Sequence, residues 1–145
     1  MNTLTRQLCT FTVDNHLMGV DAQSVQEVIR YQEMTYVPLA SPAVCGLINL
    51  RGQIVTAIDL RKRLGLADRS EDRLPMNVVV RGEDGAVSLL VDQIGDVIEV
   101  AEDLFELPPE TLRGSARSFV HGAYKLETQL LLLLNTEQVV QVGHE

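Results

Sequence analysis

Aromatic residues are scarce in this sequence. Three Phe, three Tyr and no Trp make up 4% of its 145 residues, too few for the stacking platform that binds single-stranded nucleic acid. An excess of basic charge is also missing, because the formal net charge is −8. A negative surface disfavours nucleic acid and anionic membranes. We therefore expect no nucleic-acid partner.

Long hydrophobic runs are absent as well. The longest, residues 130–134, has the length of a strand, whereas a membrane-spanning helix needs about 18 apolar residues, so we expect no direct membrane insertion. Residues 1–16 lack the apolar core of a secretory signal. Cysteine is limited to Cys9 and Cys45, each in an apolar run, which we expect to be buried, reduced thiols. Together these features predict a cytoplasmic protein.

Catalytic and metal-binding motifs are missing too. The three histidines, His16, His121 and His144, are not spaced as metal ligands with each other or with the cysteines. No glycine-rich phosphate loop ending in Gly-Lys is present. The sequence therefore predicts no catalytic residues, no metal, no cofactor and no enzymatic activity.

Short strands dominate what is present. Residues 8–13 alternate apolar and polar side chains, and residues 76–80 and 86–91 are apolar runs on either side of a polar Gly-containing loop. Residues 95–100 form a further candidate strand. Many strands with few helices favour a sandwich or small barrels.

Helix signals are few and brief. Ser24 and Glu27 have the spacing of a capping box, which predicts a short helix over 24–29. Asp59 precedes Leu-Arg-Lys-Arg-Leu-Gly as an N-cap precedes a short helix, with Gly65 at its end. Asn135 has the same place before a C-terminal helix.

The sequence also repeats itself. Residues 46–64, the first copy, align without a gap to residues 122–140, the second copy, and residues 20–29 match 91–100 more loosely. Both copies read as strand, polar pair, strand, Asp or Asn cap and helix. Such a duplication predicts two similar small β subdomains.

The corner between the two strands of each copy is not repeated. Arg51-Gly52 in the first copy is replaced by Glu127-Thr128 in the second. A glycine is useful in a tight turn because it reaches positive φ without steric cost, but a turn does not need a long cation. Arg51 is therefore expected to have a role specific to the first copy, with a plain solvated surface charge as the alternative.

At these residues the sequence resembles the CheW family, the coupling adaptors of bacterial chemotaxis arrays. The resemblance rests on residues 46–66, which include the Asn49-Leu50-Arg51-Gly52 block, and on the segments 17–31, 88–100 and 122–140. It covers about residues 6–142. Where Ser88 stands, the family often has glycine, which affects how closely a partner could approach there.

The resemblance implies a mostly β fold with short helices: two SH3-like five-stranded β-barrel subdomains packed over a shared apolar layer. The first would span about residues 14–80, and the second about 81–145 with the N-terminal strand 6–13. Both subdomains would belong to a single domain of residues 1–145. Two similar subdomains are also what the duplication predicts.

The resemblance also implies a non-catalytic adaptor that couples the cytoplasmic tip of a chemoreceptor to the regulatory domain of a CheA-type histidine kinase. Two alternatives remain: an adaptor of a chemotaxis-like pathway that controls pili or another output, and a small β-barrel enzyme or ligand binder. A ligand-sized pocket lined by convergent polar groups would favour the latter.

The implied receptor-binding residues are Arg51, Glu27, Val25, Asn49 and Gly52. Arg51 would present a planar guanidinium to carbonyls or carboxylates of a receptor helix. Glu27 would orient Arg51, or would only cap the 24–29 helix. Val25 would border the receptor groove, or would be a core residue. Met34 is the candidate kinase contact, as an exposed and adaptable side chain.

Overall fold

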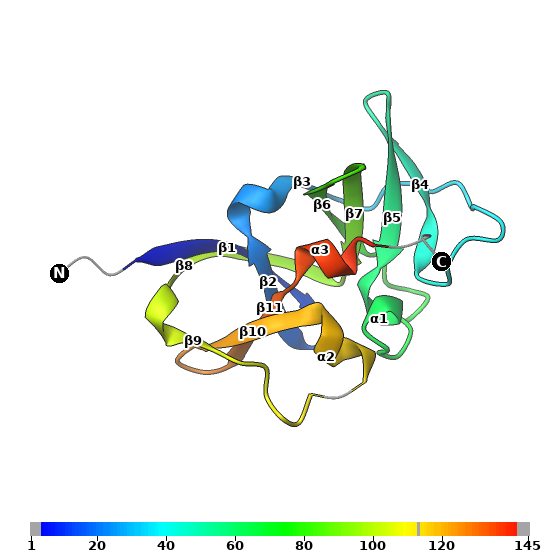
Figure 1. The fold of residues 1–145 in the computed structure, drawn as a ribbon. Coiled ribbons are helices and arrows are strands. Elements are labelled where there is room, and N and C mark those ends of the chain that lie inside the picture. The colour runs from blue at the N-terminus through cyan, green and yellow to red at the C-terminus, as the bar shows by residue number, and fades with distance from the viewer. Residues whose placement is uncertain (1–3, 113, 142–145) are drawn as a thin grey trace.

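The computed structural model describes residues 4–112 and 114–141, which form two β-sheets and a few short helices (Figure 1). The six-stranded sheet has the order β8-β1-β2-β11-β10-β9 and the five-stranded sheet has the order β3-β6-β7-β5-β4. In neither sheet do the first and last strands pair among these residues, so the sheets are open rather than closed barrels. The predicted mostly β class with two packed β units is confirmed.

The strands of the six-stranded sheet come from both ends of the chain. They are β1 (Thr5–Val13), β2 (His16–Asp21), β8 (Gln93–Ala101), β9 (Phe105–Glu106), β10 (Val120–Lys125) and β11 (Leu130–Leu134). The five-stranded sheet is formed by β3 (Val25–Ile29), β4 (Val44–Leu50), β5 (Gln53–Asp59), β6 (Met76–Gly82) and β7 (Gly85–Val91).

Three short α-helices follow strands or precede them. They are α1 (Leu60–Arg63), α2 (Ser115–Phe119) and α3 (Thr136–Val139), and 3-10 turns occupy Ala22–Ser24 and Glu102–Leu104. None of the helices in the described ranges has the length and apolar character needed to span a bilayer.

The internal repeat is confirmed in the pairing register. Two residues before the first copy Val44 pairs with Ile58, and two residues before the second Val120 pairs with Leu134; each pair is followed by a bulge. The second strand of each copy then pairs in parallel with a strand of a separate hairpin, β5 with β7 and β11 with β2. Both copies end at a capped helix, since the Asp59 and Asn135 side chains accept backbone hydrogen bonds at the starts of α1 and α3.

A glycine opens each copy because another segment crosses it closely. A Cβ on Gly46 would lie 2.7 Å from the carbonyl oxygen of Thr35, and one on Gly122 would lie 2.6 Å from that of Glu106. Both distances are too short for a real side chain. Glu106 belongs to β9, and Thr35 makes an isolated bridge to Leu47 in the corresponding place. The repeat therefore extends to this crossing segment.

Three apolar clusters fill the interior. The largest lies between the sheets and includes Phe11 and Leu132 from one sheet with Ile58 and Leu89 from the other. Each sheet also has one smaller cluster of its own. It lies around Val55 in the five-stranded sheet and around Tyr124 and Leu131 in the six-stranded sheet. The cluster between the sheets corresponds to the shared apolar layer that the family resemblance implies.

The sheets divide the chain at other positions than the expected subdomain limits of 14, 80 and 81. Strand β2 stays with β1 in the six-stranded sheet, and β7 stays with β6 in the five-stranded sheet. The reason is local, because each pair is an antiparallel hairpin with a two-residue turn. The five-stranded sheet thus comes from residues 25–91, while the division into two subdomains itself stays a prediction.

The predicted helix over 24–29 is wrong. Only a 3-10 turn forms at Ala22–Ser24, capped by the Asp21 carboxylate, which accepts from the Gln23 amide at 3.0 Å. Val25–Ile29 is strand β3, paired with β6. Its β-branched residues suit a pleated, half-buried surface. The backbone of this segment forms hydrogen bonds with strand β6 instead of with the side chains of a capping box.

Candidate functional site

The Arg51-Gly52 turn lies at the tip of the β4–β5 hairpin, which projects from the rest of the molecule (Figure 1). Both residues have positive φ, 51° for Arg51 and 88° for Gly52, as in the two-residue turns that match the twist of a hairpin. The Asn49 side chain accepts a hydrogen bond from the Gly52 amide at 2.9 Å and fixes the corner. Asn49 and Gly52 therefore have clear roles in shaping this turn.

Arg51 occupies a backbone conformation that disfavours a residue with a long side chain. The left-handed region costs roughly 1–2 kcal/mol for residues other than glycine, and Asn and Asp bear it best. The second copy closes its hairpin through a 2.8 Å hydrogen bond from the Leu126 amide to the Gln129 carbonyl, and neither Glu127 nor Thr128 has positive φ. The fold can thus make this corner without an arginine.

Arg51 and Glu27 form an ion pair between the hairpin tip and strand β3. The pairing expected for these two residues is therefore confirmed, and the capping role of Glu27 is excluded because residues 25–29 are a strand. The Glu27 side chain is 19% exposed and that of Arg51 is 75% exposed. A half-buried carboxylate thus holds an arginine whose outer donors face solvent.

Val25 and Val28 face different surroundings, because a bulge in the pairing with β6 separates Val25 from Glu27. Val25 is half-buried and packs against the cluster between the sheets. Val28 is the exposed residue of the two. Val25 therefore contributes to the core, and its place at a receptor groove stays a prediction.

Met34 lies apart from the Arg51 corner. It is half-buried rather than fully exposed and packs against the core of the five-stranded sheet. The Cβ of Met34 is close to Gly46: a Cβ added to that glycine would lie only 3.0 Å from it. Met34 thus lies beside strand β4, in the segment around Thr35 that crosses Gly46.

A buried charge cluster was not expected from the sequence. The Asp92 side chain is only 11% exposed and accepts two hydrogen bonds from Arg61, at 3.0 and 2.6 Å. Arg69 donates to it at 3.0 Å and the Asp14 amide at 2.7 Å. The cluster joins the start of α1 to the β1–β2 turn, and so one sheet to the other.

The ionisation of Asp92 follows from these contacts. Burial by itself raises the pKa of its carboxyl, but the hydrogen bonds from Arg61 and the Asp14 amide, with the charges of Arg61 and Arg69, outweigh burial and leave this pKa below its usual value. The hydrogen bond to Asp92 likewise raises the pKa of Arg61. The pair remains charged at neutral pH, and its spacing of 31 residues explains why no sequence motif reveals it.

Two other expectations concern reactive groups. Cys9 and Cys45 are free thiols but half-buried rather than fully buried, and burial, reinforced by Asp21 and Asp59 respectively, raises the pKa of both. Among the described residues no group of three or more His, Cys, Asp or Glu side chains could hold a metal. His144 lies outside those residues.

Ser88 is fully buried rather than presented to a partner. Its hydroxyl donates to the Asn77 side chain at 2.7 Å, and that side chain donates to the Arg30 carbonyl at 2.9 Å. The serine thus helps to anchor the chain just after β3, the strand that carries Glu27.

Comparison with known proteins agrees with this architecture. A family model described as a CheW-like domain matches residues 7–143. The chain is 29% identical over 137 residues to a chemotaxis protein CheW of Treponema pallidum, covering 92% of this chain and 81% of that protein. It is 30% identical over 134 residues to the one of Bacillus subtilis, covering 92% and 86%. The crystal structure of scaffolding protein TtCheW from Thermoanaerobacter tengcongensis superposes with a TM-score of 0.87 at 27% identity, covering 98% of this chain and 97% of that one.

Proposed function

This chain belongs to the CheW family of non-catalytic chemotaxis scaffolds, and we propose that it couples chemoreceptors to a CheA-type histidine kinase. In this role one surface binds the cytoplasmic tip of a receptor and another binds the regulatory domain of the kinase. The proposal places the protein in the cytoplasm, held at receptor arrays by its protein partners.

The observation that carries the proposal is the Arg51 corner. An arginine in the left-handed region, at a hairpin tip that the second copy closes without one, does not contribute to the fold in an obvious way. Strained backbone at an exposed position is a common sign of function. The half-buried Glu27 fixes the guanidinium while leaving most of it in solvent.

The chemistry of this corner suits the backbone or side chains of a docked helix. A guanidinium has five donors in a rigid plane, so it can hold one carboxylate through Glu27 and still donate to carbonyls or carboxylates of a partner. Asn49 and Gly52 set the angle at which Arg51 leaves the hairpin. Val25 supports strand β3 from the core side.

Met34 is the proposed kinase contact. It packs against the core of the five-stranded sheet, next in sequence to Thr35, which bridges to Leu47 of strand β4. A half-buried methionine adapts well to a partner surface. Two separate surfaces would let one molecule hold receptor and kinase together.

The test is a three-component binding experiment with this protein, a chemoreceptor cytoplasmic fragment and a CheA regulatory domain, analysed by size-exclusion chromatography. We expect a ternary complex. Met34→Arg should lose the kinase domain and keep the receptor fragment, because a charge at a half-buried contact must be desolvated on binding. Competition of the two partners for one site would contradict the proposal.

A further inference from the structure

Strand β3 contains an irregularity that decides where Glu27 points. Val25 pairs with Val80 of strand β6. The next pair joins Glu27 to Val79, so β3 has one more residue than β6 at this point, as in a β-bulge. Residues that face each other across an antiparallel pair lie on the same side of the sheet. Glu27 therefore lies on the face of Val79, and not on that of Val25, where regular alternation would place it.

The two faces of this sheet have different surroundings. Val80 belongs to the apolar cluster between the sheets, and Val79 belongs to the smaller cluster of the five-stranded sheet. Val25 packs against the first of these clusters, and Ile29, beyond the bulge, packs against the second. Strands β4 and β5 supply most of the second cluster. The bulge thus turns Glu27 to the side on which the β4–β5 hairpin lies.

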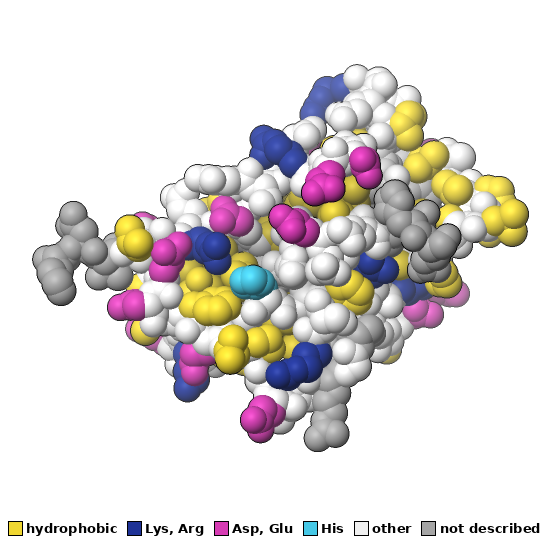
Figure 2. Space-filling model, viewed as in Figure 1, with side chains coloured by type: hydrophobic (Ala, Val, Ile, Leu, Met, Phe, Trp, Pro, Cys, Tyr) yellow, Lys and Arg dark blue, Asp and Glu magenta, His cyan; other side chains and the backbone are white. Residues whose placement is uncertain are grey.

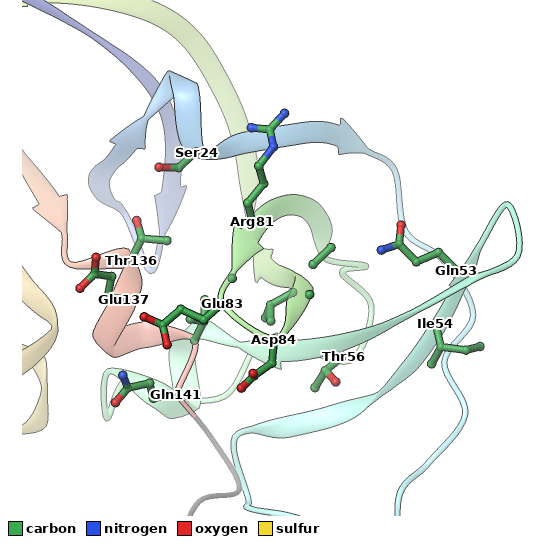
Figure 3. Close-up of a pocket in the computed structure, with 15 residues that line it drawn as sticks. Ser24, Gln53, Ile54, Thr56, Arg81, Glu83, Asp84, Thr136, Glu137 and Gln141 are labelled. Carbon is green, nitrogen blue, oxygen red and sulfur yellow. The ribbon is translucent and has the colours of Figure 1, made fainter.

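Arg81 of strand β6 holds the backbone at this bulge. Its guanidinium donates to the carbonyl of Gln23 at 2.6 Å and to that of Val25 at 3.4 Å. Figure 3 shows its side chain directed toward Ser24, between those two residues, and away from the β6–β7 turn. Hydrogen bonds from a charged donor are stronger than those between neutral groups. The rigid fork of the guanidinium can therefore span the start of β3 and fix the bulge.

Arg81 and Arg51 act on the same strand in different ways. Arg81 binds backbone carbonyls at the start of β3, whereas Arg51 pairs with the carboxylate of Glu27. Both arginines are exposed, and Figure 2 shows basic side chains at the surface over β3 and over the end of the β4–β5 hairpin. Contacts thus run from Arg81 through the bulge and Glu27 to the guanidinium of Arg51.

The six-stranded sheet has a similar bulge without an arginine. There β8 pairs with β1, as β3 pairs with β6, and the register shifts around Thr10. The buried Thr10 hydroxyl donates to the Asp96 carbonyl at 2.6 Å. The place of Arg81, two residues before the turn of its hairpin, is taken by Thr12. The duplicated fold therefore does not need an arginine at this position.

We propose that Arg81 is a positioning residue of the receptor-binding corner, which holds the β3 bulge and so keeps Glu27 in place to orient Arg51. The inference rests on the proposed function and adds a residue that acts through Glu27 rather than on the receptor itself. Removing Arg81 should therefore cost no more affinity than the Glu27–Arg51 pair supplies. For a pair with one exposed partner, that is a change in Kd of up to about fivefold.

Calorimetric titration with a chemoreceptor cytoplasmic fragment tests this dependence. Arg81→Met removes both donated hydrogen bonds and should weaken binding about threefold. In a Glu27→Gln background the same substitution should have no further effect, because the pair that it supports is already lost. Arg73→Met, which removes an exposed arginine from the loop between α1 and β6, is the charge-matched control and should bind like the unmodified protein. A loss of equal size in both backgrounds would overturn the inference.

A second measurement needs no receptor. The heteronuclear NOE of the Arg51 Nε–Hε group reports by NMR how firmly that side chain is held. This NOE should fall in Arg81→Met and stay unchanged in Arg73→Met. Both variants should unfold at the same urea concentration as the unmodified protein, because both side chains are exposed. An unchanged NOE in Arg81→Met would overturn the inference.

The two measurements separate the inference from the function beneath it. If the receptor fragment does not bind the unmodified protein while the NOE falls as expected, then the adaptor role fails and the positioning of Arg51 by Arg81 stands. If the fragment binds and requires Arg51, but Arg81→Met binds it normally, then the adaptor role stands and the inference fails.

Discussion

At the scale of single residues, Arg51 combines three properties that the fold does not need together. It has a left-handed backbone, an exposed guanidinium and a partly buried acidic partner. A residue kept for stability at this turn would be Gly, Asn or Asp. The choice of arginine therefore favours binding over stability.

Substitution at Arg51 should separate those two quantities. Arg51→Ala should change the free energy of unfolding by less than about 0.5 kcal/mol, since the side chain is mostly solvated. Arg51→Asn should stabilise the protein by about 0.5–1 kcal/mol, because Asn tolerates the left-handed region. Both should lose binding to a receptor fragment. Urea unfolding and calorimetric titration measure the two effects, and an Asn variant that binds normally would remove Arg51 from the site.

The Glu27–Arg51 pair should show measurable coupling. Exchanging the charges, with Glu27→Arg and Arg51→Glu together, should recover part of the receptor affinity that each single change loses. The expected coupling is about 0.2–1 kcal/mol, as for pairs with one exposed partner, and it should decrease at high salt. A double-mutant cycle gives this value. Zero coupling in both affinity and stability would mean that Arg51 is oriented by another group.

Residues differ in how far the sequence could reveal them. The expectation of a specific role for Arg51 followed from comparing two copies of one hairpin, and its ion-pair partner Glu27 followed from the family resemblance. The Asp92 cluster could not be found this way, because its three charged side chains come from a helix, a loop and a strand junction. An isolated aspartate in a sequence looks the same whether a buried arginine faces it or not.

At the scale of secondary structure, local signals were right where a side chain caps a helix and wrong where a strand partner competes. Asp59 and Asn135 do cap the short helices expected after them. The Ser24-x-x-Glu27 signal failed because residues 25–29 pair along one edge with β6 and so form a strand instead of a helix. Tertiary pairing outweighs a capping box, whose two hydrogen bonds are worth about 1 kcal/mol each.

The position of β3 should depend on a buried hydrogen-bond chain. Ser88→Ala leaves the Asn77 oxygen buried without its donor, and Asn77 in turn holds the Arg30 carbonyl just after β3. Loss of one partner of a buried polar group costs about 1–3 kcal/mol. We expect that decrease in the free energy of unfolding, with faster amide exchange in residues 27–30.

Ser70→Ala is the control, because the Ser70 hydroxyl bonds only to the exposed Asp72 on the surface. Its stability should stay within about 0.5 kcal/mol of the unmodified protein. Equal effects of the two substitutions would show that the Ser88 hydroxyl does not anchor β3.

At the scale of the whole molecule, the duplication predicted two similar β units. Two matching hairpins were enough to imply them, and the registers of the two hairpins agree pair by pair. The subdomain limits implied by the resemblance stay a prediction. The sheets themselves change at other positions, because β1–β2 and β6–β7 are hairpins too and a hairpin keeps both of its strands in one sheet. No repeated sequence motif marked these hairpins clearly.

The Asp92 cluster connects the two units, so its loss should destabilise the entire molecule. Asp92→Ala leaves Arg61 and Arg69 buried without their shared partner, which costs about 3–5 kcal/mol for a buried pair. Asp92→Asn should cost less, since an amide still accepts one hydrogen bond. Urea unfolding at pH 7 should show one cooperative transition at lower denaturant in both variants.

The pH dependence of these variants tests the mechanism. The pKa of Asp92 is lower in the folded protein than its ordinary value of 3.8, so its contribution is fully present above that value. It is lost as pH falls through the folded pKa. The stability difference between the unmodified protein and Asp92→Asn should therefore be constant from about pH 5 to pH 7 and should shrink below about pH 4. A difference that persists unchanged at pH 2 would show that shape and packing, rather than the charge of Asp92, join the two sheets.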